Sequence, residues 1–137
     1  MNIQIRLEQP GDYRTVEELT REAFWNLYVP GCSEHLLVHK LRSNPAFIPE
    51  LDFVALKDNR IVGNIVFCHA AIKGDAGNQY AVITFGPVSV LPEFQKQGIG
   101  AALIQHALKT AADLGYTAVL IYGDPAYYHR FGFRSAK

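Results

Sequence analysis

The sequence predicts a mixed α/β (α+β) fold, with a central, mainly antiparallel sheet, flanking helices and one parallel β-α-β unit. Three observations support this prediction. Turn signals at Asp58-Asn59 and at residues 74–77 separate three β-rich runs, which is typical of antiparallel hairpins. Apolar residues recur at helical spacing on both sides of these runs. The later of these helical stripes lies between two apolar strands, and such strand–helix–strand units are parallel.

The N-terminal part is predicted to form one strand followed by two helices. Residues 3–7 alternate apolar and polar side chains, which indicates a half-buried strand. Pro10-Gly11-Asp12 ends this strand, and we expect the Asp12 carboxylate to cap the first helix by accepting its free N–H groups. A short second helix is expected to end before Asn44-Pro45, and its apolar residues are Leu36, Leu37, Val38 and Leu41.

Three strands are predicted in the middle of the chain. Residues 53–56 and 61–69 read as a hairpin, because Asp58 and Asn59 both tolerate the positive φ of a tight turn. A third β-rich run covers residues 80–90 and is interrupted by Gly86-Pro87. Proline cannot donate to a sheet ladder and glycine often marks a bulge, so we expect the strand to bend there.

The C-terminal part is predicted to continue as helix, strand and short helix. Gly115 is placed to end the first of these helices, whose apolar stripe comprises Ile99, Leu103, Ile104, Ala107, Leu108 and Ala111. Residues 117–122 form a short apolar strand. Pro125 can then occupy the first position of a last helix that carries Tyr127 and Tyr128.

Composition limits the classes of function. With 137 residues, 49% of them hydrophobic, the chain is expected to form a single domain over residues 1–137 with its own core. The formal net charge is +0 and there is no basic run, so neither nucleic acid nor a membrane surface is expected as a partner. No apolar run reaches the about 20 residues of a membrane span, and no signal sequence is visible. The cysteines, Cys32 and Cys68, are far apart and lack zinc spacing, which predicts a cytoplasmic protein without a metal site.

The segment from Val88 to Ala101 carries the clearest functional signal. A strand ends, a loop with Gly98 and Gly100 follows, and an amphipathic helix begins. A helix N-terminus offers unpaired N–H groups and a partial positive charge, and glycine lets an anion approach the backbone. This arrangement suits a phosphate group. The loop matches neither the Walker-type motif nor the three-glycine dinucleotide fingerprint.

Gln95-Lys96-Gln97-Gly98-Ile99-Gly100 resembles the Gln-x-x-Gly-x-Gly/Ala motif of the GNAT family of N-acetyltransferases. The resemblance implies that the loop holds the diphosphate of coenzyme A, and that the preceding strand pairs with the pantetheine arm. It also likens the bend at Gly86-Pro87 to the family's bulged strand. The implied cofactor-binding residues are Val88, Ser89, Val90, Gln95, Lys96, Gln97, Gly98, Ile99, Gly100 and Ala101.

A second segment strengthens the resemblance. Residues 125–133, Pro-Ala-Tyr-Tyr-His-Arg-Phe-Gly-Phe, are similar to the family's late Phe-Tyr-x-x-x-Gly-Phe signature. Tyr128 falls on the position of the family's frequent general acid, whereas Tyr127 stands where the family usually has phenylalanine. The form of this segment is most similar to the small bacterial YhbS-like subgroup. Relatives usually continue into another strand after this segment. The resemblance therefore leaves three alternatives for the last strand: the chain is a fragment, it is a naturally short form without that strand, or a partner chain completes the sheet.

The resemblance implies an acetyl-CoA-dependent N-acetyltransferase in which an amine attacks the thioester directly. A backbone N–H near Val88 would stabilise the oxyanion, and Tyr128 would protonate the thiolate. The alternatives are a catalytically weak acyl-CoA-binding module and the transfer of a longer acyl group. The acceptor amine belongs to a small molecule or a protein, and a homodimer is suggested by analogy alone. Candidates for the general base are Glu22, Glu34, His35 and His69.

Overall fold

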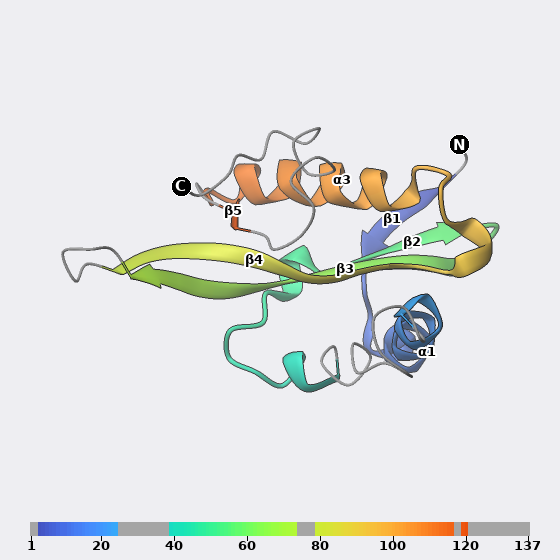
Figure 1. Ribbon diagram of the computed structural model, residues 1–137, viewed down its shortest axis with the longest axis horizontal. Helices are drawn as coiled ribbons and strands as arrows, with labels where there is room; N and C mark the ends of the chain where they lie inside the picture. Colours follow the sequence, from blue (N-terminus) through green and yellow to red (C-terminus); the bar gives the residue numbers. More distant parts are fainter. Residues whose placement is uncertain (1–2, 25–38, 74–78, 117–118, 121–137) are drawn as a thin grey trace.

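The computed structural model describes residues 3–24, 39–73, 79–116 and 119–120 of the chain. In these residues a 5-stranded sheet with the order β1-β2-β3-β4-β5 forms the middle of the molecule (Figure 1). The pairs β1–β2, β2–β3 and β3–β4 are antiparallel, and the pair β4–β5 is parallel. The strands are β1 Gln4–Leu7, β2 Phe53–Lys57, β3 Arg60–Lys73, β4 Gln79–Val90 and β5 Val119–Leu120. The expected fold class is confirmed.

Two helices cover opposite faces of the sheet (Figure 1). Helix α1 spans Tyr13–Phe24 and packs on β3 and β4, whereas helix α3 spans Ile99–Asp113 and packs on β2, β3 and β4. The described part of the predicted second helix ends at Leu41, before Asn44-Pro45 as expected. Three short 3-10 turns complete the described elements: η1 Pro10–Asp12, η2 Pro49–Leu51 and η3 Pro92–Phe94.

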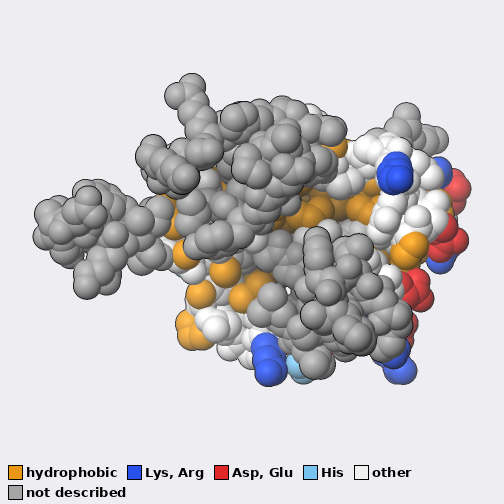
Figure 2. All heavy atoms as spheres, in the orientation of Figure 1, with side chains coloured by type: hydrophobic (Ala, Val, Ile, Leu, Met, Phe, Trp, Pro, Cys, Tyr) orange, Lys and Arg blue, Asp and Glu red, His pale blue; other side chains and the backbone are white. Residues whose placement is uncertain are grey.

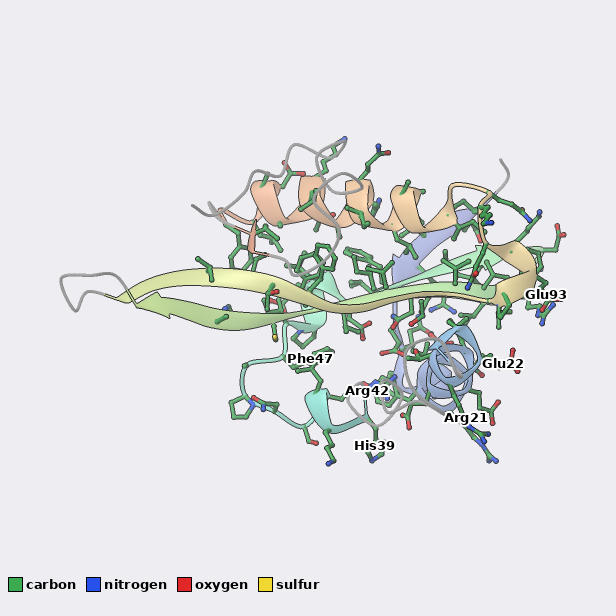
Figure 3. The ribbon with its side chains drawn as sticks, viewed as in Figure 1. Arg21, Glu22, His39, Arg42, Phe47 and Glu93 are labelled. Atoms are coloured by element: carbon green, nitrogen blue, oxygen red, sulfur yellow. The ribbon has the colours of Figure 1, made fainter. Side chains whose placement is uncertain are left out.

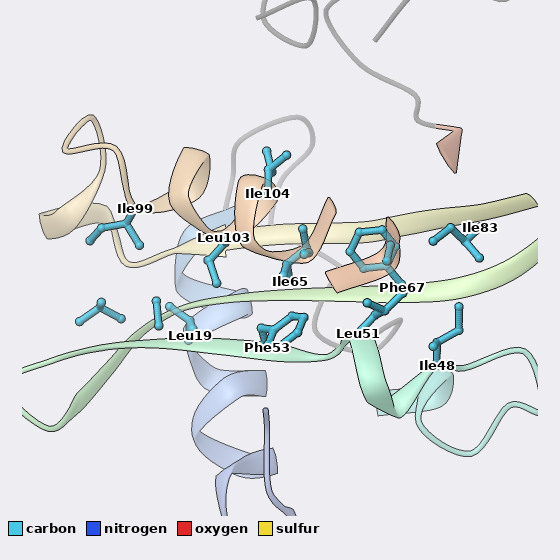
Figure 4. Close-up of a cluster of buried hydrophobic side chains, with 14 of the residues drawn as sticks. Leu19, Ile48, Leu51, Phe53, Ile65, Phe67, Ile83, Ile99, Leu103 and Ile104 are labelled. Atoms are coloured by element: carbon cyan, nitrogen blue, oxygen red, sulfur yellow. The ribbon is translucent and has the colours of Figure 1, made fainter. Parts of the chain in front are cut away.

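The main core lies between the sheet and α3 (Figure 4). Its largest fully buried side chains include Phe67, Ile65 and Leu103. Gly63 of β3 brings α3 close to the sheet, since a Cβ there would lie 3.0 Å from Leu103 Cδ1 and 3.2 Å from Ile99 Cγ2. The absence of a side chain at this position therefore sets how closely the first turns of α3 approach the sheet.

Two predicted turns are confirmed by backbone geometry. Asp58 and Asn59 have φ values of 53° and 64°, which gives the tight hairpin between β2 and β3 its two left-handed residues. Gly115 has a φ of 94° just after α3. Its N–H donates to Ala112 O, as expected of a glycine that ends a helix.

The predicted role of Asp12 was wrong. A turn of 3-10 helix, η1, precedes α1, so Asp12 lies inside a helical segment instead of flanking one. Its carboxylate turns back toward the preceding strand and accepts a bond of 2.9 Å from Gln9 N. Arg6 Nη1 donates to the same carboxylate at 2.7 Å, and this bond lowers the pKa of Asp12. Asp12 is therefore the third residue of η1 and not its N-cap; its carboxylate forms a capping box with the N-cap residue Gln9 and also pairs with Arg6.

Candidate functional site

Strand β4 contains a bulge at Gly86-Pro87, as the sequence predicts. Ile65 of β3 pairs with Val88, and Phe67 pairs with Phe85. Two steps along β3 thus correspond to three steps along β4, so β4 holds one extra residue at this point. Strand β5 pairs with β4 before the bulge, at Ile83 and Thr84. Among the described residues, no strand pairs with the other edge of β4 beyond the bulge.

The backbone groups of Val88 and Val90 face this open edge. Leu91 N donates to Val62 O at 3.0 Å, so Leu91 and Val62 form a hydrogen-bonded pair of the β3–β4 ladder. Bonded and non-bonded pairs alternate in an antiparallel ladder. Ser89 therefore bonds to β3, whereas Val88 and Val90 turn their N–H and C=O groups away from it. The side chain of Gln95 reaches Val90 O at 3.0 Å from the loop, which agrees with this direction.

The open edge leads directly to the N-terminus of α3. After η3, Lys96 and Gly98 adopt positive φ values of 62° and 87°. Gly98 is the N-cap residue and provides no side-chain cap. The first N–H groups of a helix have no partner within it, so the groups from Ile99 to Ala101 are available to an anion. The strand edge and the helix N-terminus thus both offer backbone groups, and η3 and a short loop join them.

The loop between β4 and α3 is held by a contact within itself and by contacts with the β2–β3 hairpin. Gln97 Nε2 donates to Glu93 O at 3.4 Å within the loop. From the β2–β3 hairpin, Arg60 Nη2 lies 3.1 Å from Glu93 Oε1, and Lys57 Nζ lies 5.4 Å from the centre of the Phe94 ring. Acidic and basic side chains gather together at this end of the face seen in Figure 2. The position of the loop is thus set by contacts with the β2–β3 hairpin. The surface around the loop carries both acidic and basic side chains.

A buried polar cluster lies on the α1 face of the sheet. Arg42, labelled in Figure 3, is 8% exposed and pairs with Glu8 at 2.9 Å, and it also pairs with Glu17 of α1. Burial, followed by the adjacent Glu8 carboxylate, raises the pKa of Asp52 to about 9. Asn64 Nδ2 donates to Asp52 Oδ1 at 3.1 Å and to Phe53 O at 2.8 Å. Burial and the Glu8 carboxylate thus both favour the neutral form of the Asp52 carboxyl group.

An open hollow of about 570 Å³ adjoins α1. Its described lining comprises Glu18, Arg21 and Glu22 of α1 together with Pro92. Figure 3 shows Glu22 on the side of α1 nearer to Glu93 and the loop. The hollow thus lies between α1 and the start of η3, beside the loop that precedes α3.

Comparison with known proteins identifies the class of fold and site. The sequence profile described as the acetyltransferase (GNAT) domain matches residues 50–135. The chain belongs to the GNAT family of acetyltransferases. Among the curated relatives, YhbS of Escherichia coli strain K12, described as an uncharacterized N-acetyltransferase, is 32% identical over 133 residues, 96% of this chain and 74% of YhbS. The recognition of the family from the two sequence segments is thereby confirmed, and so is the enzyme class, N-acetyltransferase.

Two solved structures of the family resemble this one closely. A GNAT acetyltransferase from Brucella melitensis, in complex with acetyl-CoA, has a TM-score of 0.85 and 33% identity, covering 98% of this chain and 84% of that chain. Escherichia coli YhbS in complex with CoA has a TM-score of 0.83 and 30% identity, covering 98% of this chain and 69% of that chain. Both relatives were therefore solved with the cofactor of the family.

The structure places Val88 and Val90 at the open edge of β4, Ser89 on the same strand but bonded toward β3, and the predicted residues from Gln95 to Ala101 in the loop and the first turn of α3. Tyr128, Glu34 and His35 lie outside the described residues. His69 is exposed on β3, and its ring centre is 5.9 Å from that of Tyr116. Within the part of the chain that the structure describes, no group of three or more His, Cys, Asp or Glu side chains could hold a metal. In the same part, no helix is long and apolar enough to cross a membrane.

Sequence reasoning missed the buried polar residues on the α1 face of the sheet. Thr20 and Asn64 are 0% exposed and Asp52 is 3% exposed. Thr20 follows Leu19 within the apolar stripe of α1, and Asn64 interrupts the apolar run of β3. A polar residue within an otherwise apolar buried run was the available signal, because such a residue needs a specific partner.

Proposed function

We propose that this chain transfers an acetyl group from acetyl-CoA to an amine of a small molecule or of a protein. The observation that carries the proposal is the open edge at Val88 and Val90, which ends at the uncapped N-terminus of α3. An extended pantetheine arm contains amide groups that match a strand edge. A diphosphate matches free N–H groups at a helix N-terminus. The spacing of these two features along one segment suits a single ligand that contains both groups.

The proposed cofactor contacts are made by the backbone. Val88 and Val90 would bind the pantetheine amides, and the residues from Gln95 to Ala101 would surround the diphosphate. Gln95 holds the loop to the strand through Val90 O, so the distance between the two parts of the site is fixed before the cofactor arrives. The whole of residues 1–137 is proposed to act as one domain, because α1 and α3 pack on the same sheet.

The chemistry proposed for the acetyl group needs an oxyanion donor and a general acid. The outward N–H of Val88 would donate to the thioester oxygen as negative charge develops on it, since a fixed backbone dipole stabilises such charge. Tyr128 would donate its proton to the departing sulfur, because a phenol with a pKa of about 10 and a thiol with a pKa of about 8.5 are close enough for transfer. Water would take up the proton that the amine nitrogen loses as the new amide bond forms, and the Tyr128 phenolate would then regain a proton from water.

Thermal unfolding with and without acetyl-CoA tests the cofactor site. Ligand at a hundred times its dissociation constant should stabilise the native state by about 2.7 kcal/mol, which raises the Tm by several degrees. Gly100→Glu places a carboxylate among the free N–H groups and should abolish this rise. Gln105→Glu adds the same charge on the exposed side of α3 and should retain it. No rise in the parent at millimolar ligand would refute the proposed function.

Turnover tests the role of Tyr128. In a screen of amines that detects free CoA, Tyr128→Phe should lower kcat about a hundredfold or more, because general acids contribute on this scale. The Kd for acetyl-CoA should stay unchanged. Tyr127→Phe is the matched control and should keep full kcat. Binding of acetyl-CoA without turnover of any amine would instead indicate the binding module considered from the sequence.

A further inference from the structure

The direction of the Val88 and Val90 backbone groups depends on a short piece of strand. The bulge at Gly86-Pro87 interrupts the ladder just before Val88. On the C-terminal side of the bulge, the first bonded pair of the ladder is Ser89 with Asn64, as the alternation from Leu91 and Val62 shows. A small rotation of this pair about the strand axis would swing the N–H groups on both sides of Ser89. A side-chain contact of Ser89 would therefore add to the ladder bonds in fixing this direction.

The side chain of Ser89 is held by helix α1. Ser89 Oγ donates to Thr20 Oγ1 at 3.1 Å, and Thr20 Oγ1 donates to Val16 O at 2.9 Å. Each hydroxyl has one proton, so the direction of the chain is fixed from strand to helix. Ser89 and Thr20 are both 0% exposed. Because neither hydroxyl is in contact with bulk water, the bond between them does not compete with solvent.

The partner strand is fixed at the same level. Asn64 faces the same side of the sheet as Ser89, and its amide donates to Phe53 O at 2.8 Å and to Asp52 Oδ1 at 3.1 Å. Both members of the cross-strand pair are thus tied to other elements through polar side chains. An alanine or valine at these buried positions would fill space without fixing orientation, whereas buried side-chain hydrogen bonds do fix it. Among the described residues, Asn64 Oδ1 is a buried polar atom that has no hydrogen-bond partner, so the network acts through the Asn64 amide donor and the two hydroxyl groups.

We propose that Ser89 is a positioning residue, which through Thr20 holds the backbone of Val88 and Val90 in the direction that the pantetheine arm requires. The inference rests on the proposed function, because it assigns a role to the strand that would bind the cofactor. Ser89 acts through its neighbours and makes no contact with the reacting atoms.

The test separates positioning from stability. Ser89→Ala leaves Thr20 still bonded to Val16, so this variant should unfold at nearly the parental urea concentration. Thr20→Val leaves the Ser89 hydroxyl buried without a partner and should be clearly less stable. The double variant removes both groups and should recover much of that stability. All three variants should bind acetyl-CoA about tenfold more weakly by calorimetry, since the bond is lost in each.

Amide hydrogen exchange supplies a second measurement, which a change in overall stability alone would not alter. In the parent, acetyl-CoA should slow exchange at Val88 and Val90, whereas Leu91 is protected with or without ligand. This ligand-dependent protection should be reduced in Ser89→Ala. Thr110→Val is the matched control, because Thr110 Oγ1 donates to His106 O at 2.9 Å in α3, on the exposed surface. It removes the same kind of bond from a helix without changing acetyl-CoA binding.

Two results would overturn the inference. Parental affinity in Ser89→Ala would show that the bond does not position the strand. Recovery of affinity in the double variant, in step with its stability, would show that the pair matters only for folding. Failure of the parent itself to bind acetyl-CoA would refute the proposed function, and this outcome is distinguished by measuring the parent first.

Discussion

At the scale of single residues, burial and neighbouring charges change the pKa of an ionisable side chain. Asp52 directly precedes β2 and is 3% exposed, beside Glu8 and Asn64. Its raised pKa keeps it neutral, so the single guanidinium of Arg42 faces fewer buried negative charges. Although burial lowers it, the Glu8 and Glu17 partners hold the pKa of Arg42 above its ordinary value.

The pH dependence of stability should reveal Asp52. Its folded-state pKa is about 9, whereas that of an unfolded aspartate is about 4. Between these values folding takes up a proton, so the contribution of Asp52 to stability falls as pH rises, by up to about 1.4 kcal/mol per pH unit. Asp52→Asn keeps a donor for Glu8 and an acceptor for Asn64 but has no proton to lose. Its stability in urea should fall less than that of the parent between pH 5 and pH 9.

The control for this measurement is Asp58→Asn, which makes the same chemical change in the exposed hairpin turn. Asparagine tolerates the positive φ of 53° at this position, so the turn should persist. The parental dependence on pH should remain in the control. Equal slopes in Asp52→Asn and the parent would contradict the assignment of a neutral Asp52.

At the scale of elements, the placement of α3 depends on a residue of another element. A Cβ at Gly63 would lie 3.0 Å from Leu103 Cδ1 and 3.2 Å from Ser89 O. The leucine end can move, but the backbone oxygen of β4 is held in the sheet. The close packing of α3 therefore tolerates no methyl group on this face of β3.

Gly63→Ala should therefore lower the free energy of unfolding by about 1–3 kcal/mol, as overpacked cores do. Because α3 begins beside this contact, the affinity for acetyl-CoA should weaken as well. Gly11→Ala is the matched control, since a Cβ there would have nothing within 4 Å. Urea unfolding and calorimetry check both effects, and equal stability of the two variants would refute the packing argument.

The elements were easier to predict than the contacts between them. The positive φ values of Asp58 and Asn59, the bulge at Gly86-Pro87 and the helix end at Gly115 all follow from local chemistry, and the sequence shows them. The loop after β4 could be assigned because its glycines and its helix lie in one segment. The Ser89–Thr20 bond joins residues 69 positions apart, which no local pattern reports. The predicted capping role of Asp12 was also wrong because of a contact between elements, since Arg6 of β1 binds the Asp12 carboxylate.

At the scale of the whole molecule, one sheet links all the described parts. The two helices pack on opposite faces of the same long strands, and the buried cluster joins α1, Arg42, β1 and β2. With a formal net charge of +0, the overall field of the protein would contribute little to binding of the proposed anionic cofactor, and local backbone dipoles would have to supply the attraction. The protein should therefore respond to unfolding and to ligand as a single unit.

The cooperativity of unfolding tests whether residues 1–137 form a single domain. Fluorescence of the chain's one tryptophan, Trp25, and far-UV circular dichroism should give coincident urea transitions, as expected of one domain. Acetyl-CoA should move both curves to higher urea together. Two separate midpoints, or a shift of only one probe, would show that residues 1–137 do not form a single domain.

Because Val88 and Val90 present backbone groups at the open edge, the proposed site has consequences for mutational scanning and for sequence divergence. Alanine at Val88 or Val90 replaces a side chain and leaves the N–H and C=O of that residue in place. An alanine scan would therefore detect Ser89 and pass over its two neighbours, whereas proline at Val88 or Val90 would remove the donor itself. By the same logic, the side chains of Val88 and Val90 are free to change among residues that suit a strand, as long as Ser89 keeps the backbone in its direction.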